Sequence, residues 1–399
     1  MSRARLDREG SLDPYLRDVL DVLLRMLHAI SGIAWIGASF YFVRLVLGLR
    51  PPKRREDAEA GVAGEFWGVH GGGLYHSQKY GLAPPGMPEP LHWFKWEAYT
   101  TWLSGFALFV LLYYFDADVR LVDPAVADLS DRQAIALSLV GIVLAWVVYD
   151  VLCRTVGQRS QVGLAIVGAG FVALAAWVAG ELLAPRAAYL QVGVMLGTIM
   201  VANVLLVIIP AHRKLVAAME EKRVPDAPPL LEAKNRSVHN NYLTLPVLFT
   251  MLAGHFAFVF GADQAWLVFV VIAVLTALIR VFFNRWHTGK RVWWIPAVTA
   301  VAVVGLALWL QPDETTPPAT GREVTFERVA PVIAARCAPC HSGASAPLGI
   351  HFETRGQIES RIDDIERQAV QTRAMPPGNQ TGMTGEERNL LAAWIASSK

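Results

Sequence analysis

Charged residues are scarce in this chain of 399 residues: Asp, Glu, Lys and Arg make up 18% of it, against 54% hydrophobic residues. Soluble globular domains carry about 25% charged residues, so the composition argues against a wholly soluble protein. The formal net charge of +2 also lacks the strongly basic balance of a nucleic-acid-binding protein. We therefore expect lipid to be the solvent for most of the chain, and we expect no nucleic-acid partner.

Cysteine is scarce as well. Three cysteines are too few for the disulfide framework of a secreted scaffold. Cys337 and Cys340 lie three positions apart in one motif, and the third, Cys153, ends an apolar run. Buried, unreactive thiols are the commoner case in such runs. Cysteine chemistry is therefore expected at the C-terminal pair.

Long apolar runs, by contrast, are abundant. A helix that crosses a bilayer needs about 20 residues, and eight runs approach or exceed that length. The predicted spans are Val19–Gly48, Glu97–Phe115, Gln133–Leu152, Val162–Ala184, Tyr189–Pro210, Asn240–Gly261, Ala265–Phe283 and Val292–Gln311. The sequence therefore predicts an all-α fold with an eight-span transmembrane helical bundle over residues 1–311.

A Pro/Thr-rich segment, "QPDETTPPATGRE", follows the last span and predicts an extended linker over residues 312–321. Residues 322–399 remain as a small soluble domain. Within it, "RCAPCH" places Cys337 and Cys340 directly before His341. Two thiols at this spacing can form thioether bonds to haem, and the adjacent imidazole can bind the iron. A zinc site would need a second Cys/His pair, which does not follow, so we expect haem c in a class I cytochrome c domain.

The second axial ligand is expected from "TRAMPPGNQTGM". Met375 precedes two prolines that would stiffen its loop. Met383 is the nearest alternative, but it lacks the proline pair and lies just before a helix. A His/Met ligand pair raises the reduction potential of haem iron, as an electron acceptor requires. The predicted iron ligands are therefore His341 and Met375.

The loop charges predict an orientation. Seventeen lysines and arginines lie in the loops that follow odd-numbered spans, against three in the other loops. Cytoplasmic loops are the basic ones, so both termini are predicted outside. In a bacterial inner membrane this makes the cytochrome c domain periplasmic, which is also the side where haem is attached to such motifs.

Ionisable residues inside predicted spans are costly and mark functional sites. His28, early in span 1, and His255, late in span 6, are predicted at similar depth in the outer half of the bilayer. Facing histidines can hold a haem b between helices. The alternative is that each imidazole hydrogen-bonds a neighbouring helix, so the pair is a possible haem b site rather than a defined one.

A second cluster is predicted on the cytoplasmic side. The long first loop, "EFWGVHGGGLYHSQKYGLAPPGMPEPLHWFKWEAYTTW", mixes histidines, lysines and aromatic residues, and long loops of this kind tend to be functional. The candidates for proton transfer are His70, His76, His92 and Glu97, and those for binding an anion are Lys79, Lys95 and Arg280. Asn240 or Asn241 can add amide donors. The alternative is that these are interfacial residues and solvated loop charges.

The runs "LHAISGIAWIGASFYFVRL", "GEFWGVHGGGLYHSQKYG" and "PLHWFKWEAYTTWLSGF", together with "CAPCH" and "MPPGN", resemble the membrane-bound urate hydroxylases of the PuuD type over nearly the whole chain. The resemblance implies purine catabolism: urate is oxidised to 5-hydroxyisourate without forming peroxide. Electrons are expected to pass to the cytochrome c domain and on to a respiratory cytochrome or terminal oxidase.

Urate is a planar monoanion at neutral pH. Its hydroxylation requires a base, a cationic or amide-rich cradle and an electron sink, which the predicted clusters provide. An alternative function is a membrane-anchored c-type cytochrome that transfers electrons without a substrate site of its own. A transporter is disfavoured because the spans show no internal repeat. A haem near the outer face does not bridge a bilayer of about 30 Å. Either a second haem binds on the cytoplasmic side, for example on His92 and His239, or the substrate binds deeper in the membrane or outside it.

Overall fold

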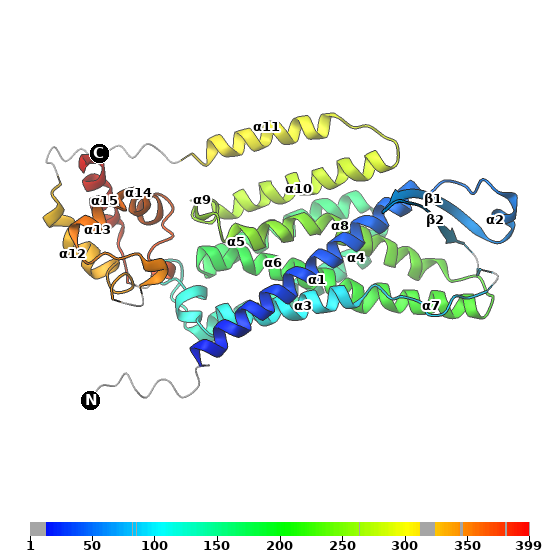
Figure 1. The fold of residues 1–399 in the computed structure, drawn as a ribbon, viewed down its shortest axis with the longest axis horizontal. Coiled ribbons are helices and arrows are strands. Elements are labelled where there is room, and N and C mark those ends of the chain that lie inside the picture. Colours follow the sequence, from blue (N-terminus) through cyan, green and yellow to red (C-terminus); the bar gives the residue numbers. More distant parts are fainter. Residues whose placement is uncertain are drawn as a thin grey trace.

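A computed structural model describes residues 13–398, except 82, 85, 263, 312–323, 344–345 and 380. The linker predicted over residues 312–321 lies outside this described part. The chain folds into an elongated helical bundle, with a β-hairpin at one end and a cluster of short helices at the other (Figure 1). The predicted helical fold class is confirmed.

The bundle is built from helices that run alternately up and down its long axis (Figure 1). The long elements are α1 (Pro14–Gly48), α3 (Trp96–Phe109), α4 (Asp131–Arg159), α5 (Gln161–Leu182), α6 (Pro185–Ala202), α7 (Ile209–Glu220), α8 (Ala227–Ala253), α10 (Ala265–His287) and α11 (Trp294–Trp309). Short elements are α2 (Arg55–Glu59), α9 (Ala257–Phe260) and the π-helical turns η2 (Val110–Tyr114), η3 (Ala117–Leu121) and η4 (Asn203–Ile208).

Among the described residues, five helices are long and apolar enough to cross a membrane. They are α1, α4, α5, the continuous Pro185–Glu220 helix and α10. The other three predicted spans are also helical but fall short of that standard. The α3 helix has 14 residues before it continues as a π turn, and α11 has 16. The α8 helix begins with a polar half that lowers its hydropathy. The count of eight spans therefore stays a prediction.

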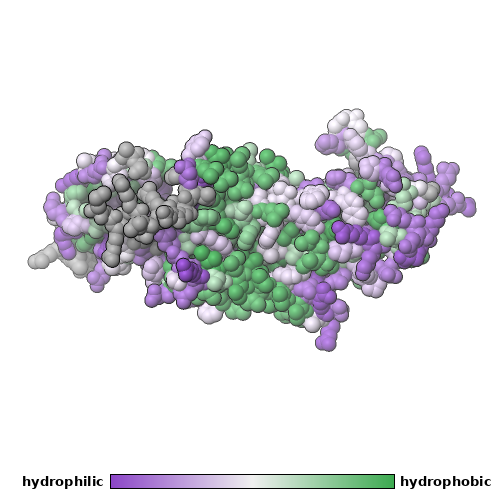
Figure 2. All heavy atoms as spheres, turned by 90° about the horizontal axis from the view of Figure 1, so that it is seen from below, coloured by the Kyte–Doolittle hydropathy of each residue, from purple (hydrophilic) through white to green (hydrophobic). Residues whose placement is uncertain are grey.

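The core lies around α6, which packs against α3, α4, α5, α8 and α10 and has eleven buried residues. The outer helices instead expose many large apolar side chains, such as Ile33 on α1 and Val301 on α11, at 72% and 73% of their surface. These side chains form an apolar belt between polar ends (Figure 2). Such a belt is what a lipid-facing surface requires.

The sequence predicted a long loop after the first span, and part of that loop has regular secondary structure. It folds into an antiparallel hairpin of β1 (Val62–His70) and β2 (Gly73–Tyr80). Gly71 and Gly72 form the turn with φ of 54° and 81°, a left-handed conformation that glycine adopts at little cost. The tight turn therefore accounts for Gly71 and Gly72.

The C-terminal residues form a separate small core. Its helices are α12 (Phe326–Arg336), α13 (Arg355–Glu359), α14 (Ile362–Ile365) and α15 (Gly385–Ser398). Val329, Ile333, Leu391 and Ile395 are almost fully buried between them. The cluster sits against the bundle at the end opposite the hairpin (Figure 1). Ala374 contacts the main core there.

Candidate functional site

A buried arginine without a carboxylate partner marks the candidate site. Arg280, on α10, is 6% exposed. Its Nε and Nη2 atoms lie 3.3 and 3.2 Å from Asn241 Oδ1, and Nη2 lies 3.4 Å from Asn284 Oδ1. The guanidinium covers the ring of Phe40 on α1, 3.8 Å from its centroid. Neutral amides and an aromatic face are thus the partners that the described residues give to this cation.

The side-chain amide of Asn241, on α8, has partners for its oxygen but none for its nitrogen among the described residues. Its side chain is fully buried, and its Oδ1 accepts from Arg280 and, at 3.1 Å, from Asn284. Its Nδ2 is buried and has no partner among the described residues. An unmet buried donor costs about 1–3 kcal/mol. The amide and the guanidinium together therefore favour an acceptor with negative charge.

Arg236 shows what a structural arginine looks like in the same bundle. It is 1% exposed and lies on α8, as Asn241 does. Its Nη2 pairs with Asp150 at 2.5 Å and with Glu232 at 3.3 Å. Burying a charge is costly unless it is paired. The contrast identifies Arg280 as the uncompensated cation.

A cavity of about 430 Å³ lies at the hairpin end of these helices, lined by Arg44, Lys53, Trp286 and His287 among others. His287 lies seven residues beyond Arg280 on α10, and Arg44 lies four residues beyond Phe40 on α1. These spacings place each pair on one helix face. His287 Nδ1 is buried without a partner among the described residues. The helix faces that carry Arg280 and Phe40 therefore lead to His287 and Arg44 at the cavity.

The hairpin contributes Glu65 to the cavity wall. Glu65 pairs with the predicted candidate His76, a contact that the sequence analysis did not predict. Glu65 on β1 lies 2.8 Å from Nε2 of His76 and accepts the Lys53 backbone N–H. Trp67 stacks on the His76 ring, with centroids 4.0 Å apart. Burial raises the pKa of Glu65, but the bonds from His76 and Lys53 outweigh it and hold the pKa below its usual value. A hairpin assignment from the glycine turn would have placed Glu65 and His76 as diagonal neighbours on one face.

Only some of the candidate residues predicted in the first loop contact one another in the structure. His92 lies 3.8 Å from Glu97, whose Oε2 is buried without a described partner. The Lys95 ammonium lies over Trp93 and Trp96, 6.0 and 5.5 Å from the ring centroids. The exposed residues His70 and Lys79 occupy the two strands and have no described side-chain partner.

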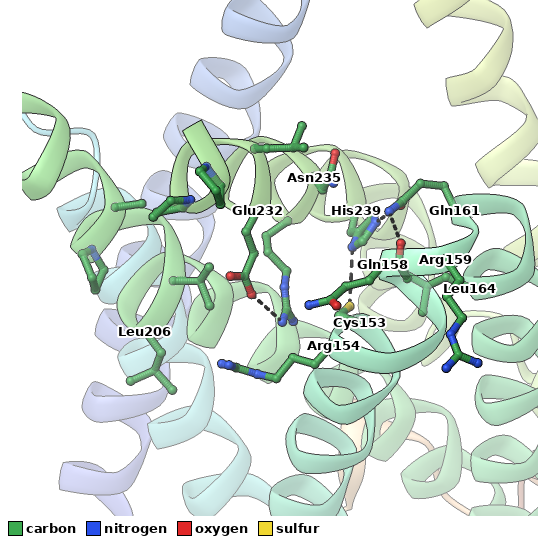
Figure 3. A pocket seen from close by; sticks show the side chains of 18 of the residues that line it. Cys153, Arg154, Gln158, Arg159, Gln161, Leu164, Leu206, Glu232, Asn235 and His239 are labelled. Carbon is green, nitrogen blue, oxygen red and sulfur yellow. Dashed lines mark hydrogen bonds and ion pairs between the residues drawn. The ribbon is translucent and has the colours of Figure 1, made fainter. Parts of the chain in front are cut away.

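His239 belongs to a separate network on the other side of α8. Its Nδ1 lies 2.8 Å from the Tyr149 hydroxyl. Its Nε2 lies 3.1 Å from Gln161 Oε1 (Figure 3). Cys153 Sγ is 3.9 Å from the same Nδ1. Both ring nitrogens are thus engaged by protein groups, which does not suit His239 as a haem ligand.

The two histidines predicted to hold haem b differ in surroundings. His28 Nδ1 lies 2.8 Å from the Thr101 carbonyl oxygen. A carbonyl can only accept, so Nδ1 carries the proton and Nε2 keeps a lone pair, as a metal ligand requires. The ring packs on Gly105, where a Cβ would lie 2.6 Å from its Cε1. His255 is exposed in the turn after α8, and no described contact joins it to His28.

The C-terminal residues fit a covalently bound haem. Cys337 and Cys340 are free thiols, and burial raises the pKa of Cys337 to about 11. His341 Nδ1 donates to the Ile350 carbonyl oxygen at 3.1 Å, which leaves Nε2 for iron. Met375 is 37% exposed, whereas Met383 is 3% exposed in the domain core. Met375 is therefore the methionine with a sulfur available to a ligand.

No group of three or more His, Cys, Asp or Glu side chains within the described ranges could hold a bare metal ion. A haem needs only one or two protein ligands, because the porphyrin supplies the others. The residues named above are thus compatible with haem but do not form a separate metal centre.

Comparison with known proteins gives one family match. Residues 14–311 match the family described as urate oxidase N-terminal. No curated protein and no solved structure is significantly similar to the chain. The matched range begins with α1, ends after α11, and contains the hairpin, Arg280, Asn241 and Asn284.

Proposed function

The chain belongs to the urate oxidase N-terminal family, and we propose that it is a membrane-bound urate hydroxylase that passes electrons to its own cytochrome c domain. Urate and water give 5-hydroxyisourate, two electrons and two protons. The observation that carries the proposal is the buried Arg280, which has amide partners and no described carboxylate.

Substrate binding is assigned to the junction of α1, α8 and α10. The urate anion supplies the negative charge that Arg280 lacks, and an exocyclic oxygen or a ring nitrogen accepts from Asn241 Nδ2. Hydrogen bonds to charged groups contribute about 1.5–3 kcal/mol each. The cavity of about 430 Å³ under the hairpin admits the substrate from the polar end.

Proton transfer is assigned to His287, which lines the same cavity, and to His76, whose partner Glu65 lines it. His287 has a buried Nδ1 without a described partner, so it can take a proton from substrate or water. The His76–Glu65 pair, at 2.8 Å, can receive that proton, because the carboxylate stabilises the imidazolium. The other first-loop candidates, His70, His92 and Glu97, remain secondary in this scheme.

Cys337, Cys340, His341 and Met375 would hold haem c, which would supply a one-electron acceptor. His28 offers a free Nε2 for a haem b, and His255 stays the predicted second ligand. The predicted orientation, in a bacterial inner membrane with the cytochrome c domain in the periplasm, would deliver electrons to a respiratory cytochrome or terminal oxidase.

Anaerobic reduction by urate tests the function. The purified full-length protein is mixed with urate under argon, and the haem α-band is followed. We expect reduction of the haem, formation of 5-hydroxyisourate and no peroxide when air is admitted. A haem that dithionite reduces but urate does not would leave the alternative, an electron-transfer subunit without a substrate site.

A further inference from the structure

A larger cavity, of about 690 Å³, lies on the other side of α8 from Arg280, between the ends of α4, α5, α7 and α8. The α7 helix, which lines the cavity, lies at the same end of the bundle as the hairpin (Figure 1). Arg154 from α4 and Glu232 and His239 from α8 converge on it (Figure 3). The proposed urate site does not use this cavity.

The lining carries an excess of positive charge. Four basic side chains reach it: Arg154, Arg159, Lys214 and Arg236. Arg154 and Arg236 share Asp150, and Arg236 also meets Glu232. Within the described part of the chain, no carboxylate pairs with Arg159 or Lys214. Two cations at the cavity are therefore free to bind an anion.

The lining is also apolar on one side. Three leucines line the cavity. Leu164 is buried, with 6% of its surface exposed, whereas Leu206 and Leu231 are 51% and 58% exposed. Leu206 belongs to the Pro185–Glu220 helix, one of the five candidate spans. The cavity thus joins a cationic rim to the apolar surface of the bundle. A soluble anion would use only the rim, whereas a lipid would use both parts.

We propose that this cavity binds the headgroup of an anionic phospholipid. Arg159 and Lys214 hold the phosphate, and an acyl chain leaves past Leu206 into the bilayer. Basic pockets between membrane helices on the cytoplasmic side suit such headgroups. The site is independent of urate oxidation, because none of its residues belongs to the proposed substrate junction.

Lipid binding to the full-length protein tests the proposal. The protein in a neutral detergent is titrated with dioleoylphosphatidylglycerol, dioleoylphosphatidylcholine or glycerol 3-phosphate, and retained ligand is counted by native mass spectrometry. The variant Arg159→Gln/Lys214→Gln removes both free cations. The control Lys222→Gln/Lys234→Gln removes two charges from α8 and the turn before it without touching the cavity lining.

We expect phosphatidylglycerol to bind the wild type and the control with the same affinity, and the cavity variant roughly 25-fold more weakly, at about fivefold for each cation. Phosphatidylcholine and glycerol 3-phosphate should bind weakly to all three. Equal weakening in the control would show unspecific attraction and overturn the site. Equally tight binding of glycerol 3-phosphate would show a soluble-anion site instead, and an unaffected cavity variant would also refute the proposal.

Discussion

Replacing Arg280 by glutamine separates binding from stability. The variant Arg280→Gln removes the charge but keeps an amide that can donate to Asn241. The lost charge-assisted bonds to the substrate anion are worth about 1.5–3 kcal/mol, which is roughly a 10- to 150-fold increase in the Kd of urate. The free protein should lose less than about 1 kcal/mol, because relief of the guanidinium's desolvation offsets its lost contact with Phe40.

The matched control is Arg236→Gln. That change leaves Asp150 and Glu232 without their buried partner, although Asp150 keeps Arg154 at 2.7 Å. Breaking a buried pair costs about 3 kcal/mol, so this variant should unfold at lower temperature than wild type. Calorimetric titration with urate gives the Kd, and thermal unfolding without urate gives the stability.

Two results would refute the reasoning. One is an Arg280→Gln variant that binds urate as tightly as the wild type, which would remove this arginine from the substrate site. The other is a loss of unfolding temperature as large as that of Arg236→Gln, because it would show that the guanidinium is already compensated in the free protein.

Three further predictions concern the hairpin and the C-terminal domain. Because the pKa of Glu65 is depressed, its pairing stabilises the hairpin above pH 4.5 and is lost at lower pH; hydrogen exchange should show this, and Glu65→Gln should abolish the pH dependence. In Gly261→Ala the new Cβ would lie 2.1 Å from a carbonyl oxygen of the C-terminal domain, so limited proteolysis should release that domain faster, unlike in Gly305→Ala. Met375→Ala should lose the methionine–iron absorption but retain haem c, whereas Met383→Ala should cost about 3 kcal/mol of stability.

Much of the helical architecture follows from the sequence because length and hydropathy are local properties. Each of the five long helices contains most of a predicted span, although some helices extend up to ten residues beyond the predicted ends. The start of α8 was not predicted. The helix begins at Ala227, so its polar half, residues 227–239, precedes the predicted start at Asn240. Tertiary packing and buried polar contacts decide that extension, and single-residue hydropathy does not record them.

The candidate site could be predicted only in part, for a related reason. Arg280 and Asp150 both lie inside predicted spans, and Arg280 was predicted to bind an anion. Which arginine Asp150 neutralises depends on how α4 packs against α8, and the answer is Arg236. The partner of Arg280, Asn241, lies 39 positions away on another helix. A sequence shows which charged side chains would be costly to bury in a membrane span. Only the packing of the helices shows which of these charges has no partner of opposite sign.

The distance along α1 tests the whole proposal. Phe40, beside Arg280, lies 26 residues from Pro14 at the other end of the helix, which is about 39 Å at 1.5 Å per residue. His28 lies 12 residues from Phe40, about 18 Å, and so divides that length nearly in half. A substrate site at Arg280 therefore requires a redox group between the two ends, and His28→Ala should remove a haem b signal from the pyridine haemochrome spectrum while sparing haem c. If the wild type contains haem c alone, urate must be oxidised at the C-terminal-domain end, and Arg280→Gln would then leave urate binding unchanged.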